Sequence, residues 1–132
     1  MTAIASAPGS RVTIGGVQAT ELAGWLNPAQ MAALQQAHGT EFAQVYLTGA
    51  GPNGGGGTYY LIQGTQGSVS IPIGSNVRWI NHTHPATLNG FPVPLMPSRA
   101  DVNVLLQLQQ AGSPQITSQI VPEVGQPFLF RN

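Results

Sequence analysis

Apolar and polar residues recur at helical spacing in the first clear element of the chain, which we predict as a helix over 27–39. Asn27 is a good N-cap, Pro28 suits the first helical position, and Gly39 follows the last turn. His38 lies in that last turn, where the helix dipole favours a basic residue. One face of this helix can pack on a sheet through its apolar positions Met31, Leu34 and Ala37.

A hairpin is predicted next, from two runs that are rich in β-branched and aromatic residues. The first run covers 42–48 and ends at Gly49, and the second covers 58–62. The glycine-rich segment between them lacks the Lys-Ser/Thr ending of a P-loop and precedes a strand, so it favours a flexible hairpin tip over a phosphate cradle. Four further stretches have the pattern of short strands: 68–73, 77–81, 115–121 and 126–130.

A second helix is predicted to begin at Ser98 and to end at Gly112, with Pro114 just beyond it. Its candidate core contacts are Val102, Leu105, Leu106 and Leu108. The order of helix, three or four strands, helix and two strands predicts an α/β (α+β) fold, built on a single mixed sheet flanked by helices.

Residues 1–20 are rich in Ser, Thr, Gly and Ala and have one short alternating patch at 11–14. We therefore expect an N-terminal tail that carries one edge strand, followed by a domain over 21–132. A chain of 132 residues is long enough to enclose one hydrophobic core.

Composition narrows the function classes. Only 6% of the residues are charged and the formal net charge is zero, so we expect neither a nucleic acid nor a membrane surface as partner. No segment has the pattern of a signal peptide or of a membrane span, which predicts a soluble chain, cytoplasmic or secreted as part of an effector. Because cysteine is absent, any metal must be held by His, Asp, Glu or water.

The candidate chemistry gathers where the strand 77–81 ends. His82 and His84 are two residues apart, so on an extended strand both side chains point to the same face and can meet one ion. Imidazole is the commonest zinc ligand, and a catalytic zinc usually has three protein ligands and a water. Asp101 is the nearest acid, while Glu41 begins a strand that can reach the same end of the sheet. Glu21 is the weaker candidate for a base because it lies in no clear strand.

Each of these residues also has a simpler interpretation. Ser98 and Asp101 are spaced as in a capping box, in which Asp101 would bond to a backbone amide. A His-x-His pair on a strand is also compatible with surface residues or with a hydrogen-bonded core pair. Glu41 alone indicates nothing. Taken singly, these features therefore also fit a globular domain without a metal.

Together, Glu41, His82-Thr83-His84-Pro85 and Ser98-Arg99-Ala100-Asp101 resemble the motif of the JAMM (JAB/MPN+) zinc metalloproteases, which is Glu, then His-Ser/Thr-His-Pro, then Ser-x-x-Asp. The resemblance spans roughly residues 40–131 and is closest to the JAB-like domains of bacterial polymorphic toxins. It implies a JAB/MPN-like (cytidine-deaminase-like) layer architecture.

The resemblance also implies a role for each residue. His82, His84 and Asp101 would hold Zn²⁺, Glu41 would be the general base, and Ser98 would hydrogen-bond the oxyanion. The substrate would be a peptide or isopeptide bond, including one formed by a ubiquitin-like protein, and the chain would act as a deconjugating enzyme or a toxin effector domain. A catalytically silent binding or scaffolding module of the same fold is the alternative.

The sequence departs from the family pattern between His84 and Ser98, where thirteen residues, 85–97, replace a shorter segment. This segment is apolar and stiffened by proline. It is predicted either to shape a substrate groove or to cap the site against ubiquitin-sized partners. An extended peptide could also add to an edge of the sheet as a further strand.

Overall fold

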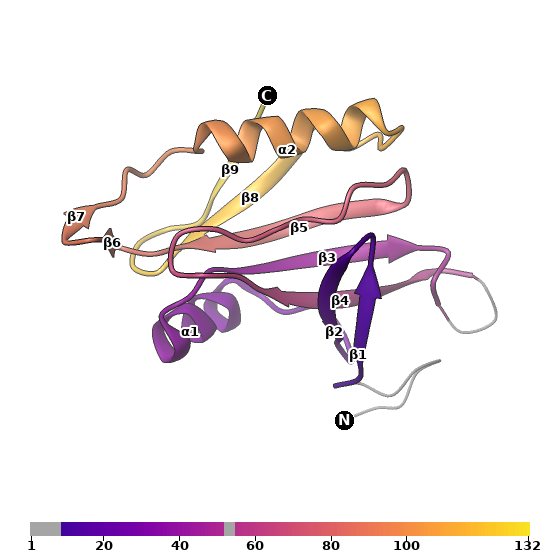
Figure 1. The fold of residues 1–132 in the computed structure, drawn as a ribbon, viewed down its shortest axis with the longest axis horizontal. Helices are drawn as coiled ribbons and strands as arrows, with labels where there is room; N and C mark the ends of the chain where they lie inside the picture. Colours follow the sequence, from indigo (N-terminus) through magenta and orange to yellow (C-terminus); the bar gives the residue numbers. More distant parts are fainter. Residues whose placement is uncertain (1–8, 52–54) are drawn as a thin grey trace.

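The computed structural model describes residues 9–51 and 55–132 and has an α+β fold, with one seven-stranded mixed sheet, two helices and a small two-stranded hairpin (Figure 1). The helices are α1 (Pro28–His38) and α2 (Arg99–Gln110). The strands of the sheet are β1 (Arg11–Ile14), β2 (Val17–Glu21), β3 (Phe42–Thr48), β4 (Gly57–Gln63), β5 (Val77–His84), β8 (Thr117–Pro122) and β9 (Phe128–Arg131). The small hairpin is formed by β6 (Thr87–Leu88) and β7 (Phe91–Pro92).

The strands of the sheet are arranged in the order β1-β2-β4-β3-β5-β8-β9. Among the described strands, β5 and β8 are the parallel pair, and every other neighbouring pair is antiparallel. A parallel pair requires a crossover connection, and here the crossover contains α2. The first turn of α2 therefore lies at the same end of the sheet as the C-terminal end of β5.

The two helices cover opposite faces of the sheet, α2 above and α1 below in the view of Figure 1. Leu105 and Leu108 of α2 are fully buried in the larger core cluster, together with Trp79 and Ile120. A smaller cluster lies under α1 and is formed by Met31, Phe42 and Val121. Neighbouring residues 120 and 121 of β8 thus belong to different cores, as the alternation of a strand requires.

Helix α1 forms as predicted. Asn27 caps it by accepting a hydrogen bond from the Gln30 amide, and the Gln30 side chain accepts one from the Asn27 amide. Gly39 ends the helix in the left-handed region at φ 69°, which a glycine adopts without steric cost. The predicted apolar face is partly wrong: Met31 is buried and Leu34 is half-buried, but Ala37 is exposed. The buried position at that level of the helix is Gln35.

Helix α2 also begins as predicted, with Ser98 as its N-cap, but it ends at Gln110, and a turn at Ala111 and Gly112 follows before Pro114. Leu105 and Leu108 are core residues, whereas Leu106 is 40% exposed and its predicted core position is wrong. Val104 packs against the core instead. Residues 101, 104, 105 and 108 share one face at helical spacing. Asp101 therefore lies on the face of α2 that packs on the sheet.

Two strand predictions are corrected. The N-terminal region has two strands, because β1 and β2 pair as a hairpin and β2 joins the sheet through β4. Strand β2 also crosses the predicted boundary between residues 20 and 21. The segment 68–73 is not a strand but an irregular loop, in which Ile71 is buried in the core and Pro72 has no N–H to donate to a ladder.

The remaining strands agree with the pattern. β3 and β4 form the predicted hairpin with Phe42 opposite Gln63, and β8 and β9 pair antiparallel at the C-terminal edge. Residues 52–54, in the predicted glycine-rich tip, lie outside the described residues. In the part of the chain that the structure describes, no helix has the length and apolar character needed to cross a membrane.

Candidate metal centre

Strand β5 presents two histidines to the face that α2 covers. His82 and His84 point to this face and are buried, while Thr83 between them points to the α1 face. The strand does not end before His82 as predicted, because β8 pairs in parallel with residues 81–84. Both histidines are therefore held by a paired strand. Ligands commonly bind where the carboxyl ends of parallel strands meet the following helix, and His84 is the last residue of β5.

Thr83 anchors this part of β5 from the opposite face. Its Oγ1 accepts a hydrogen bond of 2.9 Å from the Phe42 amide and donates one of 2.6 Å to Oε1 of Gln35 on α1. The register between β3 and β5 shifts between Gln44 and Val45, two residues after Phe42. Thr83 is fully buried, so these bonds fix the rotation of the strand on which both histidines are carried.

The first turn of α2 brings in the third group. Oδ2 of Asp101 accepts a hydrogen bond of 2.9 Å from the Ser98 amide, and Oγ of Ser98 accepts one of 3.1 Å from the Asp101 amide. This is the capping box that the sequence suggested as a simpler interpretation. The same carboxylate also faces the two histidines, so capping the helix and contacting the histidines are compatible roles for Asp101.

The ligand atoms of these three residues converge. Nε2 of His82 lies 3.0 Å from Nε2 of His84 and 3.0 Å from Oδ1 of Asp101, and Nε2 of His84 lies 3.0 Å from Oδ2 of Asp101. Bonds of about 2.0–2.2 Å in tetrahedral geometry would place ligand atoms about 3.3–3.6 Å apart. The two histidine nitrogens are close to that spacing, and the carboxylate directs one oxygen to each of them, so this group can hold a metal ion.

The electrostatics favour the metal-binding forms of two of these side chains. Burial lowers the pKa of His82, although the neighbouring Asp101 acts in the opposite direction, so its imidazole is neutral at neutral pH. Burial alone would raise the pKa of Asp101, but hydrogen bonds with His82, His84 and the Ser98 amide hold it well below its usual range. A neutral imidazole and a carboxylate are the states that metal coordination requires.

Apolar rings fix the orientation of His82. Its ring stacks on Trp79 with centroids 4.6 Å apart, and it packs edge-on against the Phe130 ring with centroids 6.0 Å apart. Among the described residues, Nδ1 of neither His82 nor His84 has a hydrogen-bond partner. At metal sites the second ring nitrogen of a ligating histidine usually bonds to a carboxylate, a carbonyl or a water. Here the imidazole directions are set by packing and by the strand instead.

Glu41 lies immediately before β3 and lines the same cavity as His84 and Asp101. Its side chain is buried, and burial raises the pKa of Glu41 to about 7, with His84 lowering it and Asp101 raising it to smaller extents. Two backbone hydrogen bonds hold the residue in place: its amide donates to Thr65 O, and its carbonyl accepts from the Gly64 amide. The sequence-based expectation that Glu41 reaches this end of the sheet is met.

Gly64 is required for this arrangement. A Cβ built on it would overlap the carbonyl oxygen of Ser68 and would lie 2.8 Å from Val69. Such contacts cannot be accommodated without moving the loop 64–69, which both holds Glu41 and forms part of the cavity wall. A side chain at residue 64 would therefore disturb the position of the carboxylate.

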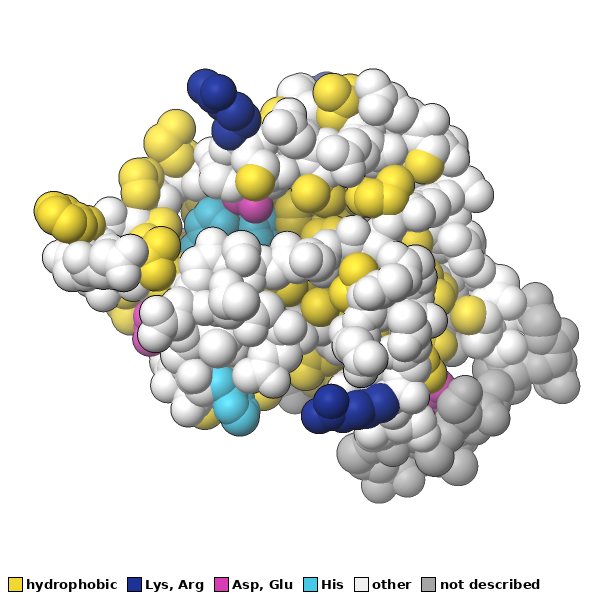
Figure 2. Space-filling view, viewed as in Figure 1, with side chains coloured by type: hydrophobic (Ala, Val, Ile, Leu, Met, Phe, Trp, Pro, Cys, Tyr) yellow, Lys and Arg dark blue, Asp and Glu magenta, His cyan; other side chains and the backbone are white. Residues whose placement is uncertain are grey.

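Ser98 lies at the exposed rim of the cavity. Its oxygen accepts the hydrogen bond of the Asp101 amide, so its O–H remains able to donate to a group inside the cavity. The cavity has a volume of about 230 Å³. Figure 2 shows histidine and acidic side chains together at the bottom of a recess below one end of α2, with hydrophobic side chains beside them.

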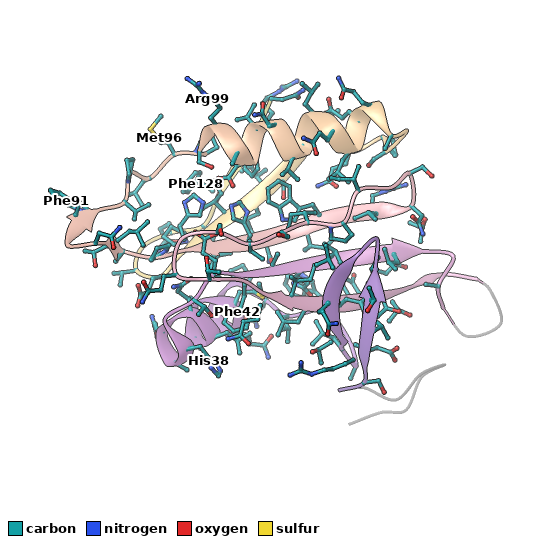
Figure 3. The ribbon with its side chains drawn as sticks, in the orientation of Figure 1. His38, Phe42, Phe91, Met96, Arg99 and Phe128 are labelled. Carbon is teal, nitrogen blue, oxygen red and sulfur yellow. The ribbon has the colours of Figure 1, made fainter. Side chains whose placement is uncertain are left out.

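The other titratable candidates lie elsewhere. Glu21 ends β2 and is buried opposite Tyr60, whose pKa is raised by burial and by this carboxylate, but Glu21 does not line the cavity. His38 ends α1 and packs on Phe42 with ring centroids 5.5 Å apart, and Figure 3 shows the two side by side on the α1 side of the sheet.

Sequence reasoning missed the residues that support the site. Gln35 is polar but lies one turn after Met31, on the buried face of α1, and this position was a usable signal for a buried hydrogen bond. The apolar wall of the cavity left no such signal, because Val69, Leu88 and Val104 come from three separate segments.

No family model matches the chain, and neither a curated protein nor a solved structure matches it significantly.

Proposed function

We propose that this protein is a zinc-dependent peptidase or isopeptidase of JAMM type, with a JAB/MPN-like architecture. The observation that carries the proposal is the convergence of His82, His84 and Asp101, whose nearest nitrogen and oxygen atoms are 3.0 Å apart, beside a cavity lined by His84, Asp101 and Glu41. A buried pair of imidazoles with a carboxylate suits zinc, and the adjacent carboxyl group suits proton transfer.

When bound, zinc would lower the pKa of a coordinated water to about 7 and polarise the substrate carbonyl. Glu41 would take the proton of the attacking water and deliver it to the leaving amine. Its pKa of about 7 is near the operating pH, which is the best value for a group that must both accept and release a proton. Ser98 would donate its O–H to the carbonyl oxygen as that oxygen gains negative charge.

The substrate class follows from the family resemblance, which favours a peptide bond or an isopeptide bond of a ubiquitin-like protein. We propose that the chain acts as a deconjugating enzyme or as the effector domain of a bacterial toxin. The long segment 85–97 lies at the site, since Pro85, Leu88 and Val93 line the cavity. This segment is therefore placed to control which substrates reach Glu41.

The metal is tested by measuring the zinc content of purified protein and of two histidine variants. We expect about one zinc per chain in the wild type and a large loss in His82→Ala, because one of three ligands is removed. His38→Ala is the matched control and should retain zinc, since His38 lies on the α1 side of the sheet. Equal zinc content in all three proteins would contradict the assignment.

The chemistry is tested with Glu41→Gln. We expect this variant to retain zinc and to lose about 10²- to 10⁴-fold in kcat for a cleaved peptide, because the proton acceptor is removed without a change in size. Wild-type rates in Glu41→Gln would exclude Glu41 as the base. A zinc-bound wild type that cleaves neither peptides nor isopeptides would instead support a catalytically silent binding module.

A further inference from the structure

We propose that the cavity beside His84 and Asp101 binds an aliphatic side chain of leucine size, so that the preferred scissile peptide bond is flanked by such a residue. This inference rests on the proposed peptidase function and specifies its substrate class. It is carried by the walls of the cavity, by its volume and by its position next to the metal group.

The cavity is lined by a few charged or titratable residues and by a larger apolar set. The charged and titratable ones are Glu41, His84 and Asp101, which belong to the site itself. The rest of the wall is mainly apolar, with the aliphatic residues Val69, Ile71, Leu88, Val93 and Val104. A charged substrate side chain would lose its hydration there without gaining a partner, whereas an aliphatic one would gain by leaving water.

The volume agrees with one side chain of intermediate size. The cavity of about 230 Å³ is larger than an apolar cavity of about 150 Å³, which is sufficient to bind benzene. An isobutyl group fits within it, and a residue without a side chain would leave the aliphatic wall exposed to water. The cavity therefore favours Leu over Gly beside the scissile bond.

The apolar part of the wall is formed by packed segments. Ile71 is 8% exposed and belongs to the main core, and Val69 and Val104 pack against that core. Leu88 from the β6–β7 hairpin approaches the loop before β5 so closely that a Cβ on Gly67 would lie 2.9 Å from Leu88 Cδ2. The segment 85–97 thus completes the cavity as one of its walls.

The apolar surface continues on the other side of His84. A second cavity of about 100 Å³ shares His84, Pro85 and Val93 with the first and is otherwise lined mostly by apolar residues that include Leu95, Ile120 and Phe128. A peptide crossing the metal group from one cavity to the other would place a larger side chain on one side and a smaller one on the other. We therefore expect Leu-Ala or Ala-Leu to be the preferred pair.

The test uses quenched fluorescent peptides of one common sequence with a central Leu-Ala, Ala-Leu, Gly-Gly, Asp-Ala or Ala-Asp pair. We expect kcat/KM for the better Leu peptide to exceed that for Gly-Gly and for both Asp peptides by about 10- to 100-fold. Val104→Phe should fill the cavity and reduce this preference, with zinc content unchanged. Leu106→Phe, on the exposed side of the same helix, should keep the preference.

A binding measurement separates this inference from the proposed function. The same peptides, labelled for fluorescence anisotropy, are titrated with zinc-loaded Glu41→Gln protein. Tighter binding of a Leu peptide that Val104→Phe removes supports the inference, even if no peptide is cleaved. Cleavage with equal rates for all pairs, or a preference for Gly-Gly, overturns the inference and leaves the peptidase function standing. Protein that holds no zinc and neither binds nor cleaves any peptide overturns both.

Discussion

Burial of the Glu41 carboxyl group destabilises the folded protein when that group is ionised, although the proposed catalysis uses it. A glutamate in water has a pKa near 4.5, and burial raises the pKa of Glu41 to about 7. The folded protein therefore binds this proton more tightly than the unfolded chain does. The contribution to stability is present at low pH and is lost as the pH rises from about 4.5 to about 7.

This gives a stability prediction for metal-free protein. Glu41→Gln should increase the free energy of unfolding by about 2 kcal/mol at pH 8, because the amide has no charge to bury. Near pH 4.5 the two proteins should differ much less. Urea unfolding in the presence of a chelator at both pH values is the measurement, and an equal effect at the two pH values would contradict the assignment of burial as the cause.

Thr83 is a second residue whose side chain has a role that the motif alone does not explain. Thr83→Val keeps the shape but leaves the Phe42 amide and Oε1 of Gln35 without their partner, and both groups are buried. We expect a loss of about 2 kcal/mol in the free energy of unfolding and weaker zinc binding. Thr83→Ser keeps the hydroxyl and should restore most of both. A Val variant as stable as the wild type would show that these bonds are not needed.

At the level of elements, the site depends on how a loop, a strand and a helix start are packed together. The loop 64–69 holds the backbone of Glu41, β5 carries the histidines, and the first turn of α2 carries Asp101. Each piece is short and locally well determined. Helix α1 and the β3–β4 hairpin were predicted correctly from their caps and alternation, because these signals act within a few residues.

Gly64→Ala tests the loop. The added Cβ would meet the carbonyl oxygen of Ser68, so the loop must move and Glu41 with it. We expect a loss of about 1–3 kcal/mol in stability and at least a 10-fold fall in kcat, with zinc retained. Gly24→Ala is the control, because a Cβ there meets nothing within 4 Å. If both variants have the activity of the wild type, the loop does not position Glu41.

Elements whose state depends on distant partners were predicted less well. The strand containing the histidines was expected to end at residue 81, but it continues to His84 because β8 lies alongside it. The segment 68–73 has the composition of a strand, yet no strand in the described part of the chain pairs with it. In both cases pairing, which connects residues far apart in sequence, overrides the local pattern.

Across the whole molecule, the candidate metal group joins β5, an interior strand of the sheet, to α2, the helix that covers one face. Binding of an ion at His82, His84 and Asp101 would therefore stabilise the folded state relative to the unfolded chain, in which Asp101 is not held beside the histidines. The effect should be large because the ligands come from two elements separated by the segment 85–97.

This predicts a dependence of thermal stability on zinc. With free zinc at about 100 times Kd, the free energy of unfolding should rise by about 2.7 kcal/mol, and a chelator should reverse the rise. The increase should disappear in His84→Ala and persist in His38→Ala. Scanning calorimetry with and without zinc measures it, and an equal increase in the two variants would place the metal elsewhere.

The local pattern of residues was sufficient for the two helices, their N-caps and the main hairpin, because capping and alternation are properties of short segments. It could not establish that Glu41, His82, His84 and Asp101 meet. Their meeting depends on the antiparallel register of β3 with β5, on the parallel pairing of β5 with β8 and on the crossover through α2. These contacts join segments dozens of residues apart, and they form because burying both faces of the sheet requires them.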